Sequence, residues 1–112
     1  MLEIIAQGPE LRHRLRIVLR TGERMLLGRD PGVPISIPWD PLISRRHVQI
    51  QVHDQSVEVQ RLAGTANPVF FRGETVDQFL LVPDTHFVLG STSFRLESTK
   101  SDAVKTPLEE RT

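Results

Sequence analysis

The distribution of proline and glycine is the feature that most constrains how this 112-residue chain can fold. The chain has eight prolines and seven glycines, and no window of helical length carries an i, i+3, i+4, i+7 apolar stripe without one of them inside it. Proline breaks a helix, whereas between strands it disturbs no hydrogen-bond ladder. The sequence therefore predicts a fold built from short strands.

Strand periodicity is present along most of the chain. Apolar and polar residues alternate strictly at 47–52 and 56–60, and 14–19 alternates before becoming apolar. Alternation of this kind is typical of half-buried strands. Further short apolar runs, bounded by turn-forming residues, lie at 2–6, 25–27, 35–37, 69–71, 79–82, 87–89 and 94–96. We expect an all-β sandwich of about ten to eleven short, mainly antiparallel strands, with its functional loops at one end.

The length fits one domain with its own core. We assign residues 1–97 to this domain and 98–112 to a polar tail or linker, because the periodicity ends there. The chain contains no cysteine, which favours a reducing compartment, and it lacks both an apolar run of about 20 residues and a signal-like start. We therefore expect a soluble cytoplasmic protein, and the linker indicates that the domain belongs to a longer chain.

The charge balance limits the possible partners. The 14 basic and 14 acidic residues cancel, which argues against nucleic-acid binding through a broad basic surface and gives no indication of a membrane partner. Four arginines recur at positions 12, 14, 16 and 20. A solvated strand face is the simplest interpretation of this string, and a second site for an acidic partner is the alternative.

Two separate segments place fixed positive charge beside a hydroxyl group. Gly28-Arg29 ends one strand, and Ser44-Arg45-Arg46-His47 closes a loop that begins near Trp39. Planar guanidinium groups and neutral hydroxyl donors suit a phosphate dianion. Taken singly, each of these residues fits an ordinary surface or turn position, but their occurrence together favours an anion site.

Catalytic and metal-binding interpretations find little support. Asp40, Ser44 and His47 could be imagined as a nucleophilic triad, but no Gly-x-Ser-x-Gly elbow is present. The four histidines lack metal-ligand spacing, and no phosphate-binding Gly-rich loop occurs. We expect a protein that is not an enzyme, with no catalytic residue, metal or cofactor.

Four pieces of the chain, taken in order, resemble the forkhead-associated (FHA) domain. They are Leu27-Gly28-Arg29, the stretch 40–47 ending in Ser44-Arg45-Arg46-His47, the turn Thr65-Ala66-Asn67, and the stretch 83–90 before a last strand. Together they span most of the chain. The resemblance implies a β-sandwich that binds phosphothreonine peptides.

The resemblance also implies roles for individual residues. Arg29 is expected to contact the phosphate, Ser44 to donate its hydroxyl to a phosphate oxygen, and Arg45 to add a second cation. Thr65 and Asn67 complete the expected peptide-binding set, with Asn67 bonding the peptide main chain. Gly28, through close backbone approach, and His47, through bonds to loop backbone, are expected to support the site. Arg46 is expected to face away from the phosphate.

The chain departs from the family pattern at one place. FHA domains usually carry Ser-Thr-Asn-Gly where this chain has Thr65-Ala66-Asn67-Pro68. Ala66 lacks the hydroxyl that in the family bonds the phosphate. The loss of one charged hydrogen bond weakens a complex roughly tenfold to hundredfold. Pro68 removes a backbone donor and restricts Asn67 to extended conformations. We expect weak phosphopeptide binding or a relaxed preference for threonine over serine.

Two functions follow as hypotheses. The first is a signalling module that recruits a phosphothreonine-containing partner, and the second is a phospho-independent assembly or oligomerisation domain. A third possibility is contact between copies through a phosphorylated tail, at Thr99 or Thr106.

Overall fold

The computed structural model describes residues 1–98, which form eleven strands and no helix. The strands are β1 (Leu2–Gln7), β2 (Arg14–Leu19), β3 (Arg24–Gly28), β4 (Ile35–Ser36), β5 (Val48–Val52), β6 (Val57–Arg61), β7 (Val69–Phe71), β8 (Glu74–Val76), β9 (Gln78–Leu81), β10 (His86–Leu89) and β11 (Thr92–Ser98). The predicted all-β fold is confirmed. The expected tail, with Thr99 and Thr106, lies outside the described residues except for Ser98, which ends β11.

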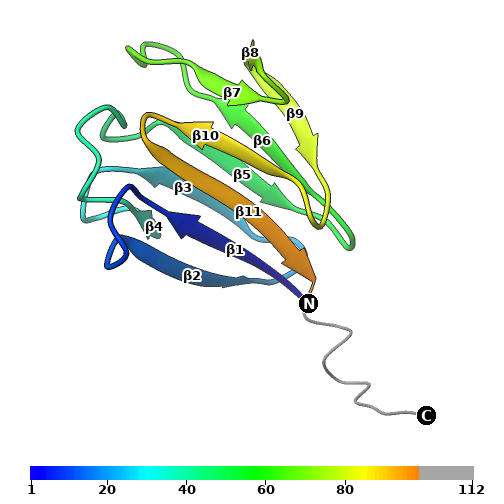
Figure 1. Cartoon of the computed structure of the whole chain (residues 1–112). Helices are drawn as coiled ribbons and strands as arrows, with labels where there is room; N and C mark the ends of the chain where they lie inside the picture. The colour runs from blue at the N-terminus through cyan, green and yellow to red at the C-terminus, as the bar shows by residue number, and fades with distance from the viewer. Residues whose placement is uncertain (99–112) are drawn as a thin grey trace.

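Two sheets stack face to face (Figure 1). One has six strands in the order β2-β1-β11-β10-β7-β8, and the other has five in the order β4-β3-β5-β6-β9. All pairings are antiparallel except that of β3 with β4. The alternation read from the sequence places every second residue between the sheets, as in Val48, Ile50 and Val52 of β5, each at most 1% exposed.

Four phenylalanines link the two sheets through the core. Phe71, Phe87 and Phe94 come from the six-stranded sheet and Phe79 comes from the five-stranded one. Their ring centroids follow one another at 4.4, 5.5 and 4.9 Å. Ring pairs at such separations add to the stability that area burial provides. The aromatic chain therefore ties β9 to the opposite sheet.

Strand β8 is the element that the sequence did not reveal, whereas its hairpin partner β7 coincides with the apolar run at 69–71. Arg72 and Gly73 connect the two strands with φ of 56° and 80°, the left-handed pair that a two-residue hairpin turn requires. Arginine rarely adopts such a conformation, and Glu74–Val76 is too short to show alternation. Eleven strands result, the upper end of the predicted range.

Three connections gather at one end of the sandwich, on the left in Figure 1. They are the β3–β4 loop (29–34), the β4–β5 loop (37–47) and the β6–β7 loop (62–68). The tight β5–β6 turn lies at the opposite end. The fold thus brings the Arg29, Ser44 and Asn67 segments to the same end of the molecule.

Candidate functional site: three loops at one end of the sandwich

The end of β3 and the β4–β5 loop touch backbone to backbone. The amide of Arg29 donates to the carbonyl of Ser44 at 3.0 Å, and the amide of Asp30 donates to the carbonyl of Arg45 at 3.1 Å. A Cβ added at Gly28 would lie 2.0 Å from the carbonyl oxygen of Arg45. Only glycine permits this approach, so the two arginine-bearing segments are held side by side by the backbone.

The side chain of Arg29 is oriented by one of its own nitrogens. Its Nε donates to the carbonyl of Ile43 at 3.0 Å, and no other described residue bonds its terminal nitrogens. Arg29, Asp30, Pro31 and Arg45 line one cavity of about 290 Å³. Two arginines therefore border a shared space large enough for a phosphoryl group, and the terminal donors of Arg29 have no partner among the described residues.

Ser44 adjoins this cavity through its backbone but is not among the residues that line it. Its amide donates to Nδ1 of His47 at 3.0 Å, and its hydroxyl bonds no other described residue. Arg45 and Arg46 follow on the exposed side of the loop. The Ser44 hydroxyl is thus a donor that no partner within residues 1–98 uses, on a residue whose backbone carbonyl accepts from the amide of Arg29.

His47 joins two of the loops from a fully buried position. A backbone amide can only donate, so Nδ1 accepts from Ser44, and the ring proton lies on Nε2. Nε2 then donates to the carbonyl of Asn67 at 2.9 Å. The imidazole is therefore neutral and bridges the β4–β5 and β6–β7 loops.

Burial lowers the pKa of His47 below its usual 6.5, and the charge of Arg61 acts in the same direction. The hydrogen bond with the Asn67 carbonyl and the nearby Asp40 carboxylate oppose this change in pKa. The neutral ring that the bridge requires is thus the form that the surroundings favour.

The β6–β7 loop is held by two further side chains. Nδ2 of Asn67 donates to the carbonyl of Leu42 at 2.8 Å, so this amide also links the loops. Arg61 donates from Nε to the hydroxyl of Thr65 at 2.6 Å and from Nη2 to the Thr65 carbonyl at 2.8 Å. Arg61 also meets Asp77 at 3.3 Å. Sequence reasoning missed Arg61, because an arginine at the end of an alternating strand carries no distinguishing signal.

Asp40 anchors the start of the β4–β5 loop to the opposite sheet. Its carboxylate, 2% exposed, accepts from the amide of Leu42 at 3.0 Å, the amide of Ser91 at 2.8 Å and the hydroxyl of Thr92 at 2.8 Å. The same Thr92 hydroxyl accepts from Nε1 of Trp39 at 3.0 Å. Asp40 therefore serves as a loop anchor.

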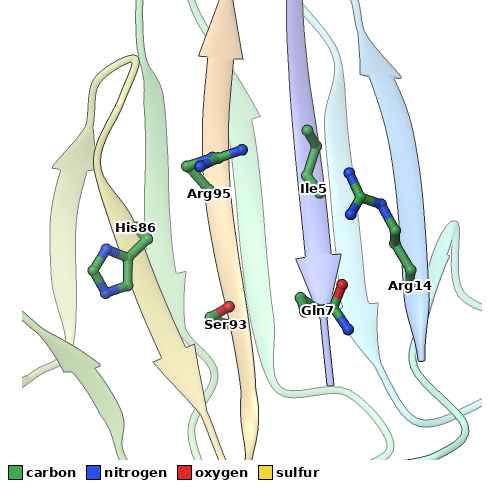
Figure 2. Close-up of a pocket in the computed structure, with 6 residues that line it drawn as sticks. All are labelled: Ile5, Gln7, Arg14, His86, Ser93 and Arg95. Carbon is green, nitrogen blue, oxygen red and sulfur yellow. The ribbon is translucent and has the colours of Figure 1, made fainter. Parts of the chain in front are cut away.

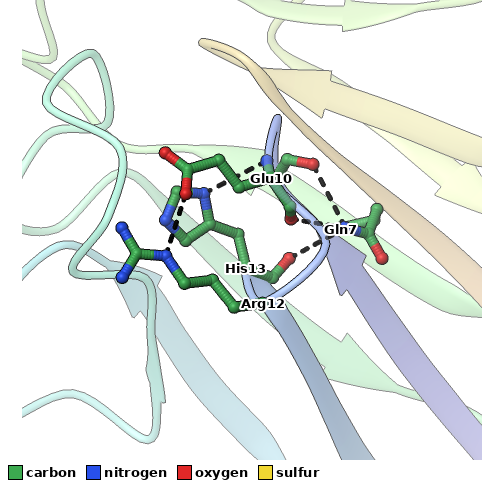
Figure 3. A network of polar contacts seen from close by, with 5 residues as sticks. Gln7, Glu10, Arg12 and His13 are labelled. Carbon is green, nitrogen blue, oxygen red and sulfur yellow. Dashed lines mark hydrogen bonds and ion pairs between the residues drawn. The ribbon is translucent and has the colours of Figure 1, made fainter.

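The β1–β2 loop packs beside this anchor. In Figure 3, the amide nitrogen of Gln7 reaches the backbone of the loop, where it donates to the carbonyls of Glu10 and His13 at 3.1 and 3.2 Å. The ring of His13 stacks on Trp39 with centroids 5.2 Å apart. The single tryptophan thus packs between the β1–β2 loop and Thr92, as a support for the β4–β5 loop.

The arrangement provides hydrogen-bond donors and positive charge. Within residues 1–98, no group of three or more His, Cys, Asp or Glu side chains could hold a metal ion, and no helix there could cross a membrane. His47 and Asp40 are both committed to loop backbone or to Thr92. The fold and these loops define a β-sandwich with polar and basic loops at one end.

Comparison with protein families gives the class a name. The model of the FHA domain matches residues 25–90, which is more than half of the chain, so the chain belongs to the FHA domain family. This confirms the resemblance read from the sequence. FHA domains are interaction modules rather than enzymes. No curated protein sequence matches the chain significantly.

Solved FHA domains share the architecture. The FHA domain of the CT664 protein from Chlamydia trachomatis superposes with a TM-score of 0.73 at 27% identity, covering 87% of this chain and 96% of that one. The FhaA FHA domain complexed with the intracellular domain of Rv3910 gives 0.73 at 20% identity, with 87% and 100% covered. A domain from a study of phosphothreonine-dependent FHA interactions superposes with a TM-score of 0.69 at 20% sequence identity. The match covers 95% of this chain and 99% of that one.

Proposed function

We propose that this FHA domain is a phosphothreonine-dependent interaction module that recruits a phosphorylated protein partner. The observation that carries the proposal is the cavity lined by Arg29 and Arg45, together with the adjoining Ser44, whose hydroxyl bonds no other described residue. Phosphorylation adds about −1.5 to −2 charge units and strong acceptor oxygens, which these three donors match. A solved neighbour studied for phosphothreonine-dependent interactions has the same fold, which supports the proposal.

Each predicted site residue has a place in this proposal. Arg29 and Ser44 bond the phosphate, and Arg45 adds charge from the exposed side. Asn67 offers its carboxamide oxygen, which bonds no other described residue, to the peptide main chain. Thr65 keeps its hydroxyl proton available because its oxygen accepts from Arg61. Gly28 and His47 hold the loops together.

Ala66 sets the expected selectivity. It is exposed on the β6–β7 loop, at the position where the family usually carries threonine. Without that hydroxyl, we expect affinity in the weaker part of the family's range and a reduced preference for phosphothreonine over phosphoserine. The module would act in cytoplasmic signalling, downstream of a threonine kinase.

Paired peptides test the proposal. A phosphothreonine peptide library is titrated against unphosphorylated copies, and the best pair is repeated with Arg29→Ala and Arg46→Ala. The phosphorylated member should bind more tightly, and Arg29→Ala should weaken it far more than Arg46→Ala, which removes a similar charge from an exposed neighbouring position. Equal affinity within every pair would refute phospho-dependence, and the reverse order of the two variants would refute the loop assignment.

A phospho-independent assembly domain is the second candidate, and the pair Ala66 and Pro68 favours it, because both remove groups that could meet a phosphopeptide. Sedimentation of the domain with and without a phosphopeptide competitor separates the two. Self-association that the competitor leaves unchanged would support assembly, whereas a monomer that binds the competitor would support recruitment.

A further inference from the structure

The outer face of the six-stranded sheet carries a basic groove away from the phosphate loops. The registers of β2, β1 and β11 place Arg16, Ile5 and Arg95 in one row across the sheet, and Arg14, Gln7 and Ser93 in the next. His86 of β10 continues the first row beside Arg95. We call the cavity over these rows the arginine groove; it measures about 400 Å³ and is lined by Ile5, Gln7, Arg14, His86, Ser93 and Arg95.

The two arginines that line the groove converge over the central strand. In Figure 2, the guanidinium group of Arg14 extends from β2 and that of Arg95 extends from β11, both toward Ile5 on β1. Neighbouring strands lie about 4.8 Å apart, so the two flanking strands are separated by roughly 10 Å. Ile5 is only 5% exposed although it belongs to the outer face. Aliphatic arginine stems cover such a residue while the charged ends stay in water.

Charge on this face is unevenly compensated. Arg16 pairs with Glu3, and Arg95 pairs with Glu97. Arg14 and His86 have no side-chain partner among residues 1–98. One guanidinium group is therefore uncompensated at the groove, and Arg95 is still half exposed, at 52%.

We propose that the arginine groove binds an acidic protein segment, with an aspartate or glutamate carboxylate placed between Arg14 and Arg95. A planar carboxylate accepts two parallel bonds from a guanidinium group, and the hydroxyl of Ser93, which also lines the groove, supplies a neutral donor. This site is separate from the phosphate loops, so the domain could hold a partner at two places. The proposal does not depend on phosphothreonine binding.

The surroundings favour a short protein segment over a nucleic acid or a lipid surface. Glu3 and Glu97 face each other in the row adjoining Ile5, so this face lacks the continuous basic surface that a nucleic acid or a lipid surface would need. The chain also has no net charge to attract one. A side-chain carboxylate, in contrast, needs only the space between the two guanidinium groups.

The test is an NMR titration of the isotope-labelled chain with acetylated, amidated hexaglutamate at low salt, with hexalysine as the opposite-charge probe. Saturable amide shifts should concentrate at Gln7, Arg14, Ser93 and Arg95. Arg14→Gln should weaken binding about tenfold, the value of one charged hydrogen-bonded contact. Arg20→Gln is the matched control, since it removes an exposed arginine that follows β2 and lies outside the groove.

Four outcomes would contradict the proposal that the arginine groove binds an acidic segment. They are the absence of saturable shifts, shifts centred on Arg29 and Ser44, equal weakening by Arg20→Gln, or tighter capture of the chain by phosphatidylserine vesicles through Arg14. Arg29→Ala separates the two proposals, because it should abolish phosphopeptide binding and leave hexaglutamate binding unchanged. Loss of both by this folded variant would also refute a separate groove.

Discussion

Replacing His47 with alanine should destabilise the domain and separate the β4–β5 loop from the β6–β7 loop. In the wild type, the buried ring accepts from the amide of Ser44 and donates to the carbonyl of Asn67, at 3.0 and 2.9 Å. Alanine leaves both backbone groups without a partner in a site closed to bulk water. An unsatisfied buried polar group costs about 1–3 kcal/mol, so the two together should lower the free energy of unfolding by roughly 2–6 kcal/mol.

That loss is large compared with the total stability of about 5–15 kcal/mol that is typical of a small domain. Urea denaturation followed by the fluorescence of Trp39, the only tryptophan, measures it directly. His86→Ala is the matched control, because His86 is exposed and has no partner among the described side chains, and it should change stability by no more than about 0.5 kcal/mol. A His47→Ala protein as stable as the control would refute the bridging role.

Three further outcomes are expected. Because the pKa of His47 is lowered in the folded state, the unfolded chain binds the proton first as the pH falls. The contribution of His47 to the free energy of unfolding should therefore be constant above pH 6.5 and decrease between pH 6.5 and the lowered pKa. An increase in stability with acidity over this range would contradict the assignment. Gly28→Ala should lower the free energy of unfolding, measured by urea denaturation, by about 1–3 kcal/mol, because the added Cβ would lie 2.0 Å from a carbonyl oxygen. Gly32→Ala should be nearly neutral, because the nearest atom to its added Cβ is 3.4 Å away. Equal effects of the two substitutions would refute the close approach. Ala66→Thr should strengthen phosphothreonine-peptide binding about tenfold in calorimetry, and exposed Ala63→Thr should not; no gain would exclude the missing hydroxyl as the weak point.

The fold could be predicted because, in a sandwich of short strands, every second side chain of a strand faces the core and is apolar. Ile50 and Val57 were assignable to strands from alternation alone, and both are completely buried. The turn at Arg72 and strand β8 were missed because β8 is only three residues long and the left-handed conformation of the turn is uncommon for arginine. The local sequence pattern is therefore informative for strands that alternate and uninformative for this turn.

Sequence reasoning selected some residues of the candidate site and missed others. Arg29, Ser44 and Arg45 could be selected because a motif of charges and a hydroxyl has a chemical meaning on its own. Arg61 acts on Thr65 through a contact that depends on how the β6–β7 loop curves back on its strand, and that curvature is a property of the fold. Contacts of this kind need coordinates.

A crystal structure of the domain bound to the phosphothreonine peptide selected from the paired library tests the central claim most directly. We predict phosphate oxygens about 3 Å from the Arg29 guanidinium group and from the Ser44 hydroxyl, with Arg45 facing the same phosphate. A phosphate bound elsewhere on the surface, or a peptide held with its phosphate pointing into solvent, would contradict the account.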